Sequence, residues 1–102
     1  MNEANSKTGQ NRDKAVHLIA RGRVQGVGFR YYTRVHADRL GLSGWVRNRQ
    51  DGTVEVWAEG TEGQLKQLIR AIQQGPTHSG VDRVDVEWSS PKGRERGFRI
   101  RY

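Results

Sequence analysis

Hydrophobic residues recur along the chain with two different periods, and the periods predict strands and helices. The segment Val16–Ala20 is apolar except for His17, which is typical of a strand in the centre of a sheet. Residues 53–59, 83–88 and 98–102 alternate apolar and polar side chains, as strands with one buried face do. Residues 45–48 and 53–59 flank an Asp51-Gly52 turn and therefore predict a hairpin.

Two further segments repeat apolar residues at helical spacing. The first begins at Phe29 and ends before Gly41, and one face of its helical wheel carries Phe29, Tyr32, Thr33, His36, Ala37 and Leu40. The second begins with a capping-box pattern formed by Thr61 and Gln64. Its apolar stripe comprises Leu65, Leu68, Ile69 and Ile72, and Gly75-Pro76 ends it.

The predicted order is βαββαβ followed by an extra terminal strand. With right-handed crossovers, such a chain forms a ferredoxin-like α/β sandwich, an antiparallel sheet with both helices on one face. In this topology the first two strands run parallel, with the third strand between them. We therefore expect the residues that follow Ala20 and those near Asn48 to meet at one edge of the sheet.

Composition limits the chain to one small basic domain. It has 102 residues with a formal net charge of +7, and 33% of its residues are hydrophobic. Residues 1–14 contain almost no apolar side chains, so we expect a disordered polar extension followed by a domain over residues 15–102. The basic charge favours an anionic partner, either a small phosphate ester or a nucleic acid.

Several classes of protein and site are excluded by what the sequence lacks. Without cysteine there is neither a disulfide framework nor a thiol nucleophile. No apolar run has the length of a membrane span, and the polar amino terminus does not have the pattern of a signal peptide. No His, Asp or Glu residues have metal-ligand spacing. We therefore expect a cytoplasmic protein without a metal or cofactor.

The segment Gly22–Arg30 carries the strongest chemical signal. Its glycines allow consecutive backbone N–H groups to converge on an anion, and the amino terminus of the following helix adds partial positive charge. Arg30 supplies a planar guanidinium that can hold a phosphate bidentately. From these residues alone, a glycine-rich turn beside an ordinary surface arginine is an equal alternative.

A second segment, Gly44–Gly52, contains Gly44-Trp45-Val46-Arg47-Asn48 and ends in glycine. Together the two segments resemble the two signature motifs of the acylphosphatase family. The first motif has Gly-Arg-Val-Gln-Gly-Val followed by an aromatic residue and arginine. The second has glycine, an aromatic residue, a small apolar residue, a variable position and asparagine, then a glycine four residues later. The resemblance extends from about Val16 to Tyr102.

The resemblance implies hydrolysis of acyl phosphates to a carboxylate and inorganic phosphate. It assigns phosphate binding to Arg30 and water positioning to Asn48. The phosphate would also contact the backbone of the preceding segment, which comprises Arg23, Val24, Gln25, Gly26, Val27 and Gly28. Because asparagine is too weak a base to deprotonate water fully, we expect the substrate phosphate to accept the proton. The expected ligands are a small-molecule acyl phosphate and inorganic phosphate, the latter as product and inhibitor, and we expect a monomer.

Other candidate residues favour structural roles. His17 lies within a strand, His36 lies on the apolar helix face, and Asp51 is typical of a turn. Gly26-Val27-Gly28 lacks the third glycine of a dinucleotide loop, because Tyr31 stands at that position. The segment also lacks the Gly-Lys-Ser/Thr ending of a P-loop.

Two alternative functions share the fold. An RNA-binding module would carry an aromatic motif on a central strand, but Thr53–Gly60 offers only Trp57, so nucleic acid is not the expected ligand. The other alternative is a non-catalytic acyl-phosphate-binding domain, of the kind found at the start of larger carbamoyl-transferring enzymes. The presence of both Arg30 and Asn48 favours a free-standing enzyme. The residues do not identify the acyl group.

Overall fold

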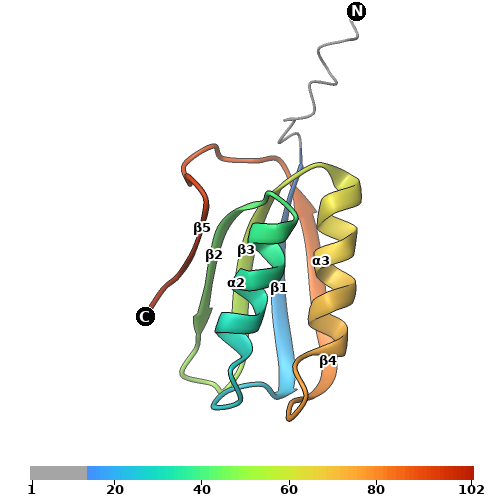
Figure 1. Cartoon of the computed structure of the whole chain (residues 1–102), viewed down its shortest axis with the longest axis vertical. Coiled ribbons are helices and arrows are strands. Elements are labelled where there is room, and N and C mark those ends of the chain that lie inside the picture. Colours follow the sequence, from blue (N-terminus) through green and yellow to red (C-terminus); the bar gives the residue numbers. More distant parts are fainter. Residues whose placement is uncertain (1–13) are drawn as a thin grey trace, which may run out of the picture.

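The structure is a computed structural model that describes residues 14–102, in which two helices cover one face of a five-stranded sheet (Figure 1). In chain order the elements are β1 (Lys14–Arg23), α2 (Phe29–Arg39), β2 (Ser43–Asn48), β3 (Val54–Gly60), α3 (Glu62–Gln74), β4 (Gly80–Ser89) and β5 (Phe98–Ile100). The expected extension over residues 1–14 lies outside the described residues except for Lys14, which begins β1 and pairs with Gly60.

The strands lie in the order β4-β1-β3-β2-β5. Because β3 pairs antiparallel with both β1 and β2, these two strands run parallel and end at the same edge of the sheet, as predicted. The ferredoxin-like sandwich is thus confirmed. The extra strand adds one feature: β5 pairs with β2 in parallel, so the sheet of residues 14–102 is mixed, and its other pairs are antiparallel.

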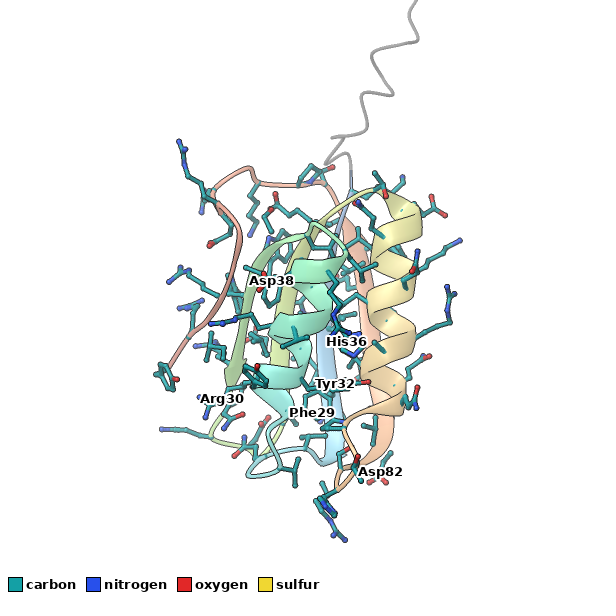
Figure 2. All side chains as sticks on the ribbon, viewed as in Figure 1. Phe29, Arg30, Tyr32, His36, Asp38 and Asp82 are labelled. Carbon is teal, nitrogen blue, oxygen red and sulfur yellow. The ribbon has the colours of Figure 1, made fainter. Side chains whose placement is uncertain are left out.

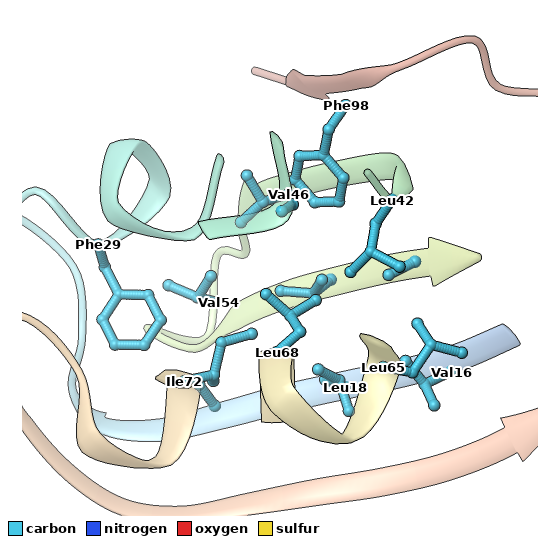
Figure 3. Packing of buried hydrophobic residues seen from close by; sticks show 14 of the residues in the cluster. Val16, Leu18, Phe29, Leu42, Val46, Val54, Leu65, Leu68, Ile72 and Phe98 are labelled. Atoms are coloured by element: carbon cyan, nitrogen blue, oxygen red, sulfur yellow. The ribbon is translucent and has the colours of Figure 1, made fainter. Parts of the chain in front are cut away.

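The hydrophobic core fills the space between the sheet and the helices (Figure 3). Side chains that alternate along β1, β2 and β3 meet the apolar faces of α2 and α3, and the fully buried ones include Leu18, Val46, Val56, Leu68 and Ile72. Burying one such side chain stabilises the fold by about 1.5–3 kcal/mol. This packing holds α2 over the ends of β1 and β2, where the candidate site lies.

The second helix, α3, begins and ends as its sequence predicts. Thr61 Oγ1 accepts a hydrogen bond from the Gln64 backbone N–H, and Gln64 Oε1 accepts one from the Thr61 N–H. This capping box satisfies donors that the first turn of a helix leaves without partners. Gly75, at φ 72° and ψ 169°, ends the helix in a backbone conformation that favours glycine.

The first helix, α2, buries a narrower stripe than predicted. Phe29, Thr33 and Ala37 are buried, whereas Tyr32 and His36 are only partly buried. The Tyr32 hydroxyl donates to the Ala71 carbonyl on α3, and its ring lies 4.4 Å from the His36 ring, centre to centre. Tyr32 therefore joins the two helices, and His36 packs on its ring.

Strand β3 is buried on both faces, although its alternating pattern predicts only one buried face. On the face away from the helices, the chain between β4 and β5 covers Glu59, which is 1% exposed. Its carboxylate accepts hydrogen bonds from Trp57 Nε1 at 2.8 Å, Lys92 N at 2.9 Å and Gly93 N at 3.1 Å. A polar residue of the outer face is thus buried because it has several donors as partners.

The last strand ends earlier than its alternation predicts. β5 ends at Ile100, and Tyr102, which was expected within it, is 97% exposed. The Arg101 N–H still donates to the Val46 carbonyl at 2.8 Å, so the chain stays beside β2 as far as Arg101. The prediction for Tyr102 was wrong because the parallel pairing with β2 ends where Ile100 lies opposite Val46.

Replacing Glu59 with alanine should lower the free energy of unfolding by about 1–3 kcal/mol, because it leaves the buried Trp57 Nε1–H and the N–H groups of Lys92 and Gly93 without their acceptor. Urea denaturation measures this change. Glu87→Ala, on the exposed outer face of β4, is the matched control and should change stability by less than about 0.5 kcal/mol. Equal effects of the two substitutions would show that Glu59 does not fasten the segment between β4 and β5.

Candidate active site

The segment between β1 and α2 forms a tight turn at the edge of the sheet. Gly26 and Gly28 have φ angles of 75° and 78°, the left-handed conformation that glycine adopts without strain. Gly28 is also the N-cap of α2, and no side chain caps this helix. The N–H groups of its first turn, which contains no acidic residue, are therefore available to an anion.

A pocket of about 320 Å³ lies beside this turn. Its lining brings together residues from the turn after β1, from α2, β2 and β5, and from the chain after β5, namely Val24, Gly26, Gly28, Phe29, Arg30, Tyr31, Asn48, Ile100 and Tyr102. Figure 2 shows Arg30 in the first turn of α2, on the side of the helix that faces β2. Arg30 and Asn48, far apart in the sequence, thus line one pocket.

Asn48 carries an unusual polar atom. Its side-chain Oδ1 is buried and has no hydrogen-bond partner within residues 14–102, and no other buried side-chain nitrogen or oxygen of this region shares that condition. Leaving a buried acceptor without a partner costs about 1–3 kcal/mol. Because this unpaired acceptor belongs to a residue beside a pocket, a molecule that enters the pocket is a candidate donor for it.

The guanidinium of Arg30 is held from one side by an aromatic ring. Its Cζ lies 4.8 Å from the centre of the Tyr102 ring, a cation–π contact. A cation–π contact is made with the ring and needs no hydrogen bond from the guanidinium, so its N–H groups remain available for a bidentate contact with a phosphate.

The other residues of the expected phosphate-binding segment lie around the pocket but do not line it. Arg23 is exposed at the end of β1, and Val27 packs against the core. Gln25 Nε2 donates to the carbonyls of Arg49 and Thr53, at 2.8 Å and 2.9 Å. Gln25 therefore ties the turn to the hairpin that follows Asn48.

The candidate general bases lie elsewhere, in the structural roles that the sequence favours. His17 bonds Glu55 Oε2 on the face of the sheet away from the helices, and His36 packs on Tyr32. Asp51 Oδ1 accepts from the Thr53 hydroxyl and N–H, which lowers the pKa of this exposed carboxyl. Among residues 14–102, no group of three or more His, Cys, Asp or Glu side chains could hold a metal ion.

Glu55 holds Arg47, the residue next to Asn48, in place. Burial alone would raise the pKa of its carboxyl, but hydrogen bonds from His17 and Arg47, together with their charges, outweigh burial and lower it. Arg47 Nε lies 2.6 Å from Glu55 Oε1, across the β2–β3 pair. Since Arg47 is held on the outer face, the adjacent Asn48 is directed to the opposite face, toward the pocket.

Sequence reasoning did not find the apolar part of the pocket lining. Tyr31, Ile100 and Tyr102 line it beside Arg30, and Tyr102 also borders a neighbouring hollow next to Asn48. The final strand is the feature of the sequence from which the position of Tyr102 at the pocket could have been predicted. If β5 had been predicted to run parallel to β2, its carboxyl end would have been placed at the same edge as Asn48.

The arrangement combines a site for an anion with an acceptor for a water molecule. Arg30 and the first turn of α2 supply positive charge, and Asn48, whose buried Oδ1 has no hydrogen-bond partner within residues 14–102, lines the same pocket. This suits attack of water on a phosphorylated substrate more than binding alone, because binding a phosphate would not require the unpaired acceptor.

Comparison with known proteins points to the same chemistry. The sequence model of the acylphosphatase family matches residues 16–100. A protein from Salinibacter ruber named acylphosphatase is 48% identical over 89 residues, which cover 87% of this chain and 94% of that protein. An acylphosphatase from Bacillus licheniformis is 52% identical over 85 residues, which cover 83% of this chain and 94% of that protein.

Solved structures agree in fold and size. The crystal structure of acylphosphatase from Bacillus subtilis has a TM-score of 0.84 and 42% identity, over 87% of this chain and 99% of that chain. The same share of this chain also matches full-length HypF in its phosphate- and nucleotide-bound form, with a TM-score of 0.77 and 28% identity. That match covers only 12% of HypF. No helix within residues 14–102 is long and apolar enough to cross a membrane.

Replacing Gly28 with alanine should weaken the binding of inorganic phosphate more than it weakens the fold. The positive φ of Gly28 should cost alanine about 1 kcal/mol of stability. The added methyl group meets no protein atom within 4 Å, so it would project into open space beside the anion site. We expect phosphate affinity to fall by at least about tenfold, measured by titration calorimetry.

Gly52→Ala is the matched control for this substitution. Gly52 has a φ of 89° and equally open surroundings, but it lies in the β2–β3 turn and does not line the pocket. It should lose similar stability and keep its phosphate affinity. Normal phosphate binding by Gly28→Ala would reduce Gly28 to a residue that only forms the turn.

Proposed function

The chain belongs to the acylphosphatase family and hydrolyses acyl phosphates to a carboxylate and inorganic phosphate, and we propose that Arg30 and Asn48 are its catalytic residues. In this proposal Arg30 and the backbone of residues 23–28 hold the phosphoryl group. Asn48 holds the attacking water. The oxygen of that water bonds to phosphorus, the bond from phosphorus to the acyl oxygen breaks, and its electron pair leaves with the carboxylate.

The unpaired Oδ1 of Asn48 is the observation that carries the proposal. An amide oxygen in this position accepts a hydrogen bond from one proton of a water and leaves a lone pair of that water free to face phosphorus. Such alignment supplies the orientation that an in-line displacement requires. The proton of the attacking water passes to the phosphate oxygen, since asparagine does not hold it.

Hydrolysis of an acyl phosphate does not require a stronger acid or base than the groups in this site. The carboxylate that leaves has a conjugate-acid pKa of about 4, so its departure needs little proton transfer. The remaining requirement is stabilisation of charge on the phosphoryl oxygens, which donors fixed in advance provide. The edge of the Arg30 guanidinium and the uncapped first turn of α2 are such donors.

The proposal extends to the protein as a whole. Residues 15–102 form the catalytic domain, in line with the family match over residues 16–100. Inorganic phosphate, the product, competes with the substrate for the same pocket. Action as a monomer and a cytoplasmic location stay predictions from the sequence.

Substitution of each assigned side chain should give a different kinetic signature. Arg30 contacts the phosphoryl group before and during reaction, so Arg30→Gln should lower kcat and weaken phosphate inhibition together. Asn48 contacts only the water, so Asn48→Ala should lower kcat by about 10²–10³-fold with the phosphate inhibition constant almost unchanged. Benzoyl phosphate hydrolysis by the purified variants measures both parameters.

Arg47→Ala is the control for this comparison, because Arg47 neighbours Asn48 but is bound to Glu55 on the outer face. It should cost much less activity than Asn48→Ala. Near-normal kcat for Asn48→Ala together with a large loss for Arg47→Ala would show that Asn48 does not position the water.

Turnover should not depend on a metal ion, because Arg30 and backbone N–H groups supply the positive charge. Activity should survive EDTA, and inorganic phosphate should inhibit competitively in steady-state assays. If EDTA abolished turnover and Mg²⁺ restored it, the charge would come from a metal and the roles proposed here would be wrong.

A further inference from the structure

The catalytic pocket is the middle one of three adjoining hollows. On one side it shares Asn48 and Tyr102 with a hollow whose other lining residues are Arg47, Arg49, Gln50 and Asp51. On the other side it shares Gly28 and Tyr31 with a hollow of about 350 Å³, also lined by Tyr32, Val35, His36, Arg39 and Pro76. The first neighbour is polar, and the second is largely apolar and aromatic.

The geometry of in-line displacement determines on which side of the catalytic pocket the acyl group leaves. The attacking oxygen and the leaving oxygen lie on opposite sides of phosphorus. If Asn48 holds the water, as proposed above, the acyl group leaves on the side away from Asn48, which is the side of Gly28 and Tyr31. From the proposed function and the order of the hollows, we propose that the acyl group binds in the hollow between α2 and Pro76, where Tyr31 selects large, flat, apolar acyl groups.

The walls of this hollow suit such a group. Tyr31 is 63% exposed, so its ring surface is available to a ligand. Tyr32 is fixed in place, because its hydroxyl is bound to the Ala71 carbonyl and its ring packs on His36. Tyr32 therefore presents its ring to the hollow, beside Val35 and Pro76. Aromatic side chains of this kind favour a flat apolar partner over a small one.

The size of the acyl group also separates the two substrates. The methyl group of acetyl phosphate is too short to extend from the phosphoryl group into the second hollow, so acetyl phosphate does not need it. In the proposed placement a benzoyl group, which is longer and flat, extends past Gly28 and lies against the Tyr31 ring.

The test compares kcat/KM for benzoyl phosphate and acetyl phosphate in the same variants. Tyr31→Ala should lower the value for benzoyl phosphate by about three- to tenfold and leave that for acetyl phosphate within about twofold. Tyr31→Phe, which keeps the ring, should behave as the unaltered protein. For each substrate, kcat/KM of the variant is divided by kcat/KM of the unaltered protein. The intrinsic reactivities of the two substrates therefore cancel.

Tyr102→Ala is the discriminating control. Tyr102 lies on the water side of the pocket and contacts Arg30, so its loss should change both substrates by the same factor. Trp88→Ala removes an exposed aromatic side chain far from all three hollows and should change neither. The inhibition constant of inorganic phosphate should be unchanged in Tyr31→Ala, because Tyr31 does not hold the phosphoryl group.

Distinct outcomes overturn the two proposals. Equal losses for both substrates in Tyr31→Ala, no loss for either, or a selective loss in Tyr102→Ala would overturn the placement of the acyl group. In each of these outcomes the roles of Arg30 and Asn48 would still be judged by their own variants. Failure of the unaltered protein to hydrolyse either substrate would overturn the proposed function itself.

Discussion

The site depends on the hydrogen bonding of β3 to both β1 and β2. Because a strand can pair antiparallel with a neighbour on each side, β3 forces these two neighbours to run in the same direction. Their carboxyl ends then lie at one edge, where β1 leads into the glycine turn and β2 ends at Asn48. Gln25 completes the junction by donating to the hairpin carbonyls of Arg49 and Thr53. The glycine turn and Asn48 take their positions from this pairing, and the pairing of β5 with β2 adds Ile100 and Tyr102.

The same edge holds the groups that cost the protein stability. An uncapped helix start and an unpaired Asn48 acceptor both weaken the fold, and both lie beside the catalytic pocket. At the opposite end, polar groups are fully used: Thr61 and Gln64 cap α3, and Glu59 accepts from several donors. Polar groups are left without partners where a substrate can satisfy them.

The sequence predicted the elements, the parallel direction of β1 and β2, and the positions of Arg30 and Asn48 at one pocket. These features follow from periodicity, glycine chemistry and motif resemblance, which are local signals. It did not predict the burial of the outer face of β3, because Glu59 is buried by a segment more than thirty residues later. The hollow at Tyr31 was also missed, since it depends on Pro76, which follows a different helix.

The pairing of β1 with β4 has a kinetic consequence. Val16 lies opposite Trp88, about 70 residues later in the chain, and the pairing extends, through a register shift between Arg21 and Gly22, to Arg23 opposite Gly80. Such distant contacts form slowly, because the entropy of a long loop is lost before the pairing of the strands can stabilise the chain. Gly22 and Arg23, at the base of the phosphate turn, are therefore paired only after residues 80–89 have joined the sheet. A newly made molecule would acquire its activity in a late folding step, together with the closing of the sheet.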